Sequence, residues 1–218
     1  MMWAMSISDV LPFTEPREPE LAELSITDPP EVWSALGFLV DDAGNLDIGG
    51  VRIRLGAKGE GGIVSWSLRR VNAMGSIDGL PTPVPRVLRP PPFQTHPNGA
   101  TGLDHIVVMT PDFDRTAAAL RRAGIALKRT QDIGRGRQGF RRVGPAILEL
   151  VDNPKLNADD PCFWGLVVTV ISLDALAERL GDHLSEIRPA IQPGRKIATL
   201  RSSAGVEPAL AFITPEPP

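Results

Sequence analysis

The chain of 218 residues has a single cysteine, no tyrosine and no apolar run near the roughly 18 residues that a membrane-spanning helix needs. One cysteine, Cys162, excludes an intramolecular disulfide framework and a cysteine-cluster zinc site, which favours a reducing compartment. The first ten residues contain no basic segment ahead of a long apolar stretch, so neither a secretory signal nor a transit peptide is expected. We therefore expect a cytoplasmic globular protein that does not associate with membranes.

The charges are unevenly distributed along the sequence, although the formal net charge is only −3. Residues 1–50 contain ten acidic side chains and one basic side chain, whereas residues 115–142 contain nine basic side chains and one acidic one. No aromatic platform for stacking bases is interleaved with the basic stretch, so we expect no nucleic-acid partner. Two interpretations of the charge distribution remain. Either the charges lie on solvated faces, with some electrostatic docking between the two halves, or they belong to a cleft that attracts an anionic small molecule.

A proline-rich segment at residues 79–100 divides the chain, because proline supports neither a helix interior nor an inner strand. We interpret this segment as a linker between an N-terminal unit at 20–78 and a C-terminal region at 101–216. The first residues, 1–19, show no periodicity and are expected to be loosely ordered.

The C-terminal region contains an internal repeat with an offset of 60 residues. Val107 then aligns with Val167, and the closing segment 145–147 aligns with 208–210 after an insertion of three residues. Each copy begins with a β-branched apolar run, continues with an amphipathic helical pattern and ends with three strand-like segments. The repeat therefore predicts two βαβββ modules, at residues 101–158 and 159–216.

The N-terminal unit has the pattern of a shorter, degenerate copy. A strand is predicted at residues 21–26, and a brief helix ending at Gly37 is predicted to be capped by Asp28. Alternating residues predict further strands at 46–55 and 63–71. Whether this region also holds part of a fourth copy is left open by the sequence.

Three segments resemble the vicinal oxygen chelate superfamily, which includes glyoxalase I, the bleomycin-resistance proteins and the extradiol dioxygenases. They are the first strand LDHIVV, the helix start TPDFDRTAAAL and the closing strand ILELVDNP. The resemblance covers residues 101–216 well and 20–75 weakly. It implies an α+β fold of tandem βαβββ modules, whose curved mixed sheets enclose a cleft and supply metal ligands from the first and last strands of each module.

The resemblance places metal ligands at His105 and Glu149, a donor pair suited to Mn, Fe, Ni or Zn. In the second copy, Gly165 and Phe212 occupy the corresponding positions, and neither side chain ligates a metal. Catalytic metal sites need about three protein ligands, so the set is half lost. The candidates for a third ligand are His96, His183 and Glu23. The alternative is that His105 and Glu149 are inward-facing polar groups hydrogen-bonded to each other, to water, or to Arg141 or Arg195.

Five further residues are candidates for ligand binding. Trp164 and Phe212 are predicted to form an apolar wall, or to be plain core residues. Gln138 and Phe140 lie on a middle strand where the superfamily places ligand-facing side chains. Arg195 lies on a predicted turn that suits a carboxylate or phosphate, or is simply solvated.

The first functional hypothesis is a small-molecule binding protein on a glyoxalase and bleomycin-resistance scaffold, with no bound metal and a ligand that carries an anionic group. The second is a divalent-metal-dependent lyase, isomerase or dioxygenase, in which His105 and Glu149 hold the ion and Glu149 is catalytic. The third is an interaction scaffold whose acidic N-terminal unit docks on basic partners. A monomer and a homodimer are both consistent with the sequence.

Overall fold

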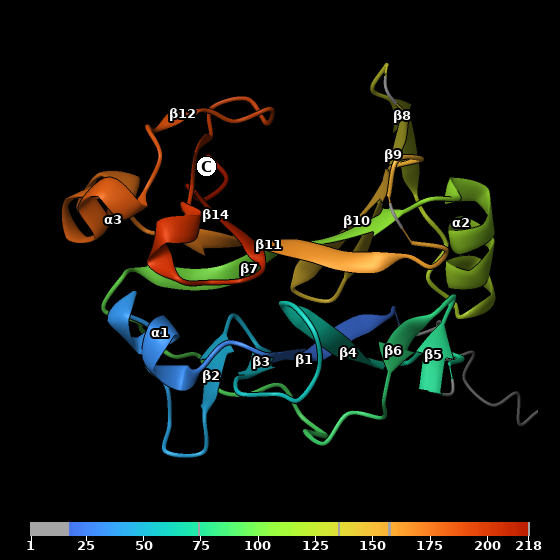
Figure 1. The fold of residues 1–218 in the computed structure, drawn as a ribbon, viewed down its shortest axis with the longest axis horizontal. Coiled ribbons are helices and arrows are strands. Elements are labelled where there is room, and N and C mark those ends of the chain that lie inside the picture. Colours follow the sequence, from blue (N-terminus) through green and yellow to red (C-terminus); the bar gives the residue numbers. More distant parts are fainter. Residues whose placement is uncertain (1–17, 74, 135, 157, 218) are drawn as a thin grey trace, which may run out of the picture.

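The structure, a computed structural model, describes residues 18–73, 75–134, 136–156 and 158–217. Most of the N-terminal segment 1–19 that we expect to be loosely ordered therefore lies outside the described residues. Two β-layers lie back to back, a four-stranded sheet from the N-terminal half and an eight-stranded sheet from the C-terminal half (Figure 1). No helix in the described part of the chain has both the length and the apolarity needed to cross a membrane.

The eight-stranded sheet is built from two βαβββ modules. The first module contains β7 (Ala100–Thr110), α2 (Phe113–Arg122), β8 (Arg129–Asp132), β9 (Arg137–Val143) and β10 (Ala146–Asp152). The second contains β11 (Cys162–Val170), α3 (Leu173–Leu180), the short 3-10 helices η1 (Gly181–His183) and η2 (Ser202–Ala204), β12 (Arg188–Pro189), β13 (Lys196–Thr199) and β14 (Ala209–Ile213). In each module the last strand lies parallel to the first, and β7 joins β11 in an antiparallel pair. The predicted α+β fold of tandem βαβββ modules in curved mixed sheets is confirmed.

Strand register confirms the 60-residue offset and corrects the end of the alignment. Val107 lies opposite Gly165, and Val167 lies opposite His105, so the β7–β11 pair is symmetric about that offset. Glu149 lies opposite Val107, whereas Ala211 lies opposite Val167. Ala211 therefore occupies the position of Glu149, and the expected three-residue insertion is two residues long at this strand. Since a slip of one residue reverses the face of a strand, this correction moves Phe212 to the opposite face.

The N-terminal sheet has the strand order β2-β3-β1-β4. Its elements are β1 (Glu20–Ile26), α1 (Pro30–Ala35), β2 (Asn45–Ile48), β3 (Val51–Arg54) and β4 (Ile63–Arg69), followed by a separate two-stranded pair, β5 (Gly75–Ile77) and β6 (Leu80–Thr82). The expected continuous strand at 46–55 is instead a hairpin, because Gly49 and Gly50 both have positive φ and turn the chain between β2 and β3.

The predicted cap of the first helix is also wrong. The N-cap of α1 is Pro29, and no side chain caps it. Asp28 is buried and accepts hydrogen bonds from Nε1 of Trp33 at 2.9 Å and from the backbone N–H of Glu207 at 3.1 Å. The carboxylate thus links the N-terminal half to the segment before β14, and it does not accept from the first backbone N–H groups of α1.

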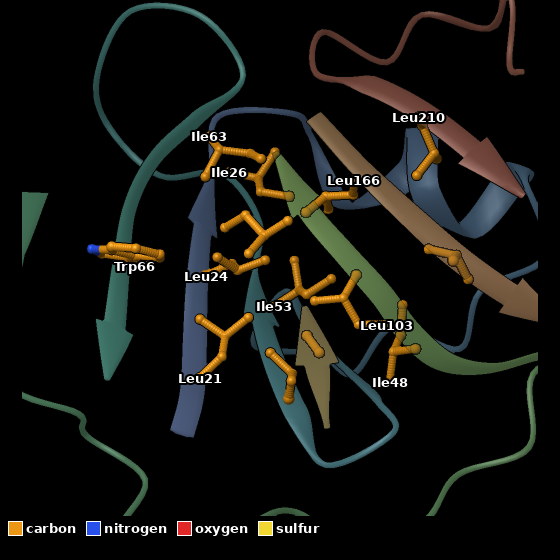
Figure 2. Packing of buried hydrophobic residues seen from close by; sticks show 14 of the residues in the cluster. Leu21, Leu24, Ile26, Ile48, Ile53, Ile63, Trp66, Leu103, Leu166 and Leu210 are labelled. Carbon is orange, nitrogen blue, oxygen red and sulfur yellow. The ribbon is translucent and has the colours of Figure 1, made fainter. Parts of the chain in front are cut away.

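The core lies between the two layers. Leu24 and Ile53 from the N-terminal sheet and Leu103 and Leu166 from the eight-stranded sheet are buried in one apolar cluster (Figure 2). Alternation along each strand leaves the polar side chains of both sheets on the outer faces. The apolar core therefore fixes the two sheets back to back and leaves their polar faces directed away from each other.

Ion pairs join the acidic N-terminal half to the basic stretch of the C-terminal half. Arg115 pairs with Asp78 at 2.9 Å, and Arg141 pairs with Glu18. These contacts are of the kind that electrostatic docking between the halves would produce. The basic stretch also supplies Arg129 to the cleft described below, so the two alternatives from the charge distribution are not exclusive.

Gly49, in the hairpin between β2 and β3, packs closely against β7 of the eight-stranded sheet. Its φ is +55°, and an added Cβ would lie 2.7 Å from the Cα of Gly102. We expect Gly49→Ala to lower the free energy of unfolding by about 2–3 kcal/mol, because backbone strain and overpacking add together. The control is Gly56→Ala, which has φ +68° and no atom within 4 Å of the added Cβ. Equal losses for both variants in urea denaturation would contradict the close contact.

Candidate functional site

A cleft of about 710 Å³ lies on the outer face of the eight-stranded sheet. The two ends of this sheet, β12 at one and β8 at the other, rise away from the N-terminal sheet (Figure 1). Its floor is formed by strands from both modules, and its walls by β8 on one side and residues 188–193 on the other. His105, Gln138, Phe140 and Glu149 all line it. The cleft is therefore a product of module pairing within a single chain, and both modules contribute to it.

A chain of polar side chains leads from the rim of the cleft to Glu149. Arg129 donates to Gln131 at 2.8 Å, Gln131 donates to Gln138 at 2.9 Å, and Gln138 donates from Nε2 to Oε1 of Glu149 at 2.8 Å. Burial raises the pKa of Glu149, and the nearby His105 partly opposes this effect. Glu149 is thus a fixed, partly desolvated carboxyl group and a stronger base than an exposed one when ionised.

His105 is oriented by a buried ion-pair network. Its Nδ1 lies 2.5 Å from Oδ2 of Asp104, and Nη2 of Arg195 donates to Oδ1 of Asp104 at 2.5 Å. Burial disfavours ionisation of Asp104, but the contacts with His105 and Arg195 outweigh it and hold its pKa at about 2. A carboxylate at Nδ1 favours the tautomer with its proton there and leaves Nε2 for a ligand.

A β-bulge explains how two adjacent residues come into contact. Residues next to each other on a regular strand point to opposite faces, but the β7–β11 register shifts between His105 and Leu103. Asp104 is left without an opposite residue on β11, which lets its carboxylate lie beside the His105 ring.

The structure brings together only some of the residues predicted from the sequence. His105, Gln138, Phe140 and Glu149 line the cleft. Arg195 does not: the expected ligand-binding or solvated position on a turn is wrong, because its guanidinium is buried and donates to Asp104 and to the carbonyl of Thr214. Trp164 is 48% exposed and lines a separate pocket with Leu200 and Glu207. Phe212 is fully buried on the core face, where its ring stacks on Phe38 with a centroid distance of 6.4 Å.

Sequence reasoning missed Asp104, Gln131 and Arg129. The family resemblance identified Gln138 and Phe140 on β9, and strand alternation on the neighbouring β8 would have added Gln131 and Arg129, which lie opposite them. Asp104 had no comparable signal, because its position depends on a bulge in the pairing with β11.

The residues at this cleft do not fit a catalytic metal. His105 offers one nitrogen, since Nδ1 faces Asp104, and Glu149 offers the second donor. Among the described residues, no three His, Cys, Asp or Glu side chains lie close enough together to hold an ion. In the second module, a side chain at Gly165 would overlap the carbonyl oxygen of Ala209, so the backbone itself excludes a ligand there.

The three residues considered as a third ligand are engaged elsewhere. Glu23 is buried in the N-terminal sheet and bonded to Arg54. The ring of His96 bonds through Nδ1 to the N–H of Leu39 and through Nε2 to the carbonyl of Asp47. His183 is exposed on η1. None of these side chains completes a donor set with His105 and Glu149.

Known proteins resemble this chain only weakly. No family model matches the chain, and no curated protein matches it. Among solved structures, methylmalonyl-CoA epimerase from Mycobacterium tuberculosis aligns at 21% identity with a TM-score of 0.45, covering 55% of this chain and 91% of that one. A variant of the Streptomyces coelicolor methylmalonyl-CoA epimerase, in complex with 2-nitronate-propionyl-CoA, aligns at 17% identity with a TM-score of 0.44 and covers 54% and 99%. A hypothetical protein from Bacillus halodurans aligns at 15% identity with a TM-score of 0.43 and covers 53% and 95%. Similarity at this level gives no information about ligand or reaction.

Proposed function

We propose that the protein binds a small molecule with an anionic group in this cleft, without a metal ion. The observation that carries the proposal is the hydrogen-bonded chain from Arg129 to Glu149, which places fixed polar groups in a cleft with a largely apolar lining. Arg129 on β8 and Arg188 on β12 lie on opposite walls, so an anionic group at either rim meets a cation. This combination of apolar lining and a few placed polar groups is typical of ligand sites.

A second candidate function is metal-independent proton transfer, of the isomerase class. The raised pKa of Glu149 and the neighbouring His105 favour it. Ionised Glu149 would take a proton from a carbon next to a carbonyl group, forming an enolate and a neutral carboxyl group. Protonated His105 would then return a proton from Nε2 to the carbon, and a proton passing from Glu149 to His105 would restore the starting state. The metal-dependent hypothesis needs a third donor, and the described residues of the cleft do not supply one.

The binding proposal predicts that removing both rim cations weakens an anionic ligand. We would screen small carboxylates and phosphate esters by thermal shift, then measure the affinity of each hit for Arg129→Ala/Arg188→Ala. We expect a loss of at least about tenfold, because the charge-assisted contact is removed at whichever rim the anionic group occupies. The matched control is Arg121→Ala/Arg122→Ala, two exposed cations on α2. The binding proposal would be abandoned if no compound in the screen bound, or if both double variants bound every hit equally well. An affinity that depended on added Mn, Fe, Ni or Zn would support the metal-dependent hypothesis instead.

The partly desolvated carboxyl group predicts a pH-dependent gain in stability for Glu149→Gln. A carboxyl group whose pKa is raised by folding contributes stability below its unfolded pKa, about 4.5, and this contribution is lost as pH rises through the folded pKa. At pH 7.5 the free energy of unfolding of the variant should therefore be about 1 kcal/mol higher than that of the wild type. Near pH 4 the two proteins should be equally stable. Urea denaturation at both pH values measures this. Lower stability of the variant at pH 7.5 would show that Glu149 is stabilising as a carboxylate.

A further inference from the structure

The N-terminal sheet repeats the register of the middle of the eight-stranded sheet. β3 lies parallel to β1 as β10 lies parallel to β7, and β4 lies antiparallel to β1 as β11 does to β7. Leu24 lies opposite both Ile53 and Trp66, which matches the way Ile106 lies opposite both Leu148 and Leu166. β4 therefore takes the place of the first strand of a partner module.

This equivalence places two charged residues at the positions of the cleft pair. Glu23 lies opposite Ser67 on β4, as His105 lies opposite Val167, and so takes the position of His105. Arg54 lies opposite Ser25, as Glu149 lies opposite Val107. Nε of Arg54 lies 2.6 Å from Oε2 of Glu23. The outer face of the N-terminal sheet therefore carries an ion pair where the other sheet carries His105 and Glu149.

A cavity of about 390 Å³ lies over this ion pair. Three serines on neighbouring strands line it, Ser25, Ser65 and Ser67, and Ser67 is only 6% exposed. None of the three hydroxyl groups bonds to another side chain or backbone group among the described residues. Hydroxyl groups without a partner in the protein are available as donors to a ligand oxygen.

The proline-rich segment forms one wall of this cavity. The N–H of Val87 donates to Oε1 of Glu23 at 2.6 Å, and Nη2 of Arg69 donates to the carbonyl of Val87 at 2.7 Å. The segment between β6 and β7 runs along the outer side of the N-terminal sheet (Figure 1), and its residues Pro83, Val84 and Arg86 line the cavity. The linker is thus bonded onto this face, so the cavity is walled rather than a flat sheet surface.

The charges at this cavity favour an anion. Arg54, Lys58 and Arg86 are basic, and Glu23, the one acidic side chain in the lining, is paired with Arg54. Asn45 also holds Arg54, accepting from its Nη1 at 3.1 Å, whereas Nη2 bonds to no other group in the described part of the chain. A guanidinium group held on two sides is preorganised to donate to an oxyanion.

We propose that the outer face of the N-terminal sheet is a second ligand cleft, which binds a small molecule carrying a phosphate or carboxylate group. Arg54 and the serine hydroxyl groups would bind the oxyanion, and Lys58 and Arg86 would attract it at the mouth. The second cleft lies on the opposite side of the molecule from the first and shares no lining residue with it. This proposal therefore stands or falls separately from the proposed function.

The test is a ¹H–¹⁵N NMR titration of the full chain with inorganic phosphate and, separately, with succinate. We expect the amides of residues 25, 54, 65 and 67 to shift with either anion, and the anion that binds more tightly identifies the preferred group. Lys58→Ala/Arg86→Ala should weaken binding about tenfold, and Arg121→Ala/Arg122→Ala should leave it unchanged. Both double variants alter exposed side chains only, so folding is preserved.

Ser67→Ala is a second variant, which removes one hydroxyl group from the floor and leaves every charge in place. A further weakening in this variant would support direct contact, because long-range attraction alone does not depend on that hydroxyl group. The proposal is overturned if neither anion shifts these amides at millimolar concentration, if the shifts map to the His105 cleft, or if the two double variants bind equally well.

Discussion

Phe212→Ala is expected to lower the free energy of unfolding by about 4 kcal/mol, the range found when a buried aromatic side chain is removed from a core. Phe212 is fully buried and stacks on Phe38, which belongs to the N-terminal half of the chain. The alanine variant would leave a cavity between the two halves. Urea denaturation followed by far-UV circular dichroism measures the loss.

Trp164→Ala is the matched control for that prediction. The sequence predicts that Trp164 and Phe212 form an apolar wall or are plain core residues, but Trp164 is 48% exposed. We expect its removal to cost less than about 1 kcal/mol. Similar losses for the two variants would contradict the placement of Phe212 on the core face. A Phe212 variant that stays folded but loses affinity for a cleft ligand would restore the prediction that Phe212 lines the cleft.

Arg195→Ala is expected to cost about 3 kcal/mol, because it leaves the buried Asp104 carboxylate without its main cationic partner. Adding Asp104→Asn to the Arg195→Ala variant should recover part of this loss, because the neutral amide does not leave an unpaired buried charge. A double-mutant cycle in urea gives the coupling energy between the two side chains. Additive losses would contradict a direct interaction.

The same network predicts sensitivity to acid. Folding lowers the pKa of Asp104 from 3.8 to about 2. The ionised carboxylate therefore stabilises the folded protein above pH 3.8, and this stabilisation is lost as the pH falls through about 2. The shift corresponds to about 2 kcal/mol of stability at neutral pH. Asp104→Asn should therefore be less stable than the wild type at pH 7 and approach it near pH 2. An unchanged difference at the two pH values would contradict the depressed pKa.

The sequence by itself determined the repeated βαβββ pattern and the four cleft residues His105, Gln138, Phe140 and Glu149. The βαβββ pattern follows from local periodicity, because strand alternation and helix amphipathicity are properties of a few consecutive residues. The four cleft residues follow from the family resemblance of the motif segments, carried over position by position. The sequence also predicts that the second module lacks a metal ligand at Gly165, since glycine has no side chain in any environment.

Only the tertiary structure decided which residues act beside those four. Asp104 reaches His105 because of a bulge in β7. Phe212 faces the core because the register of β14 differs by one residue from the alignment of the two sequence repeats. The equivalence of Glu23 and Arg54 to the cleft pair likewise appears only when β1, β3 and β4 are paired. Strand register and bulges are set by contacts between residues far apart in the chain, and a shift of one residue reverses the face of a strand, so local sequence patterns do not specify them.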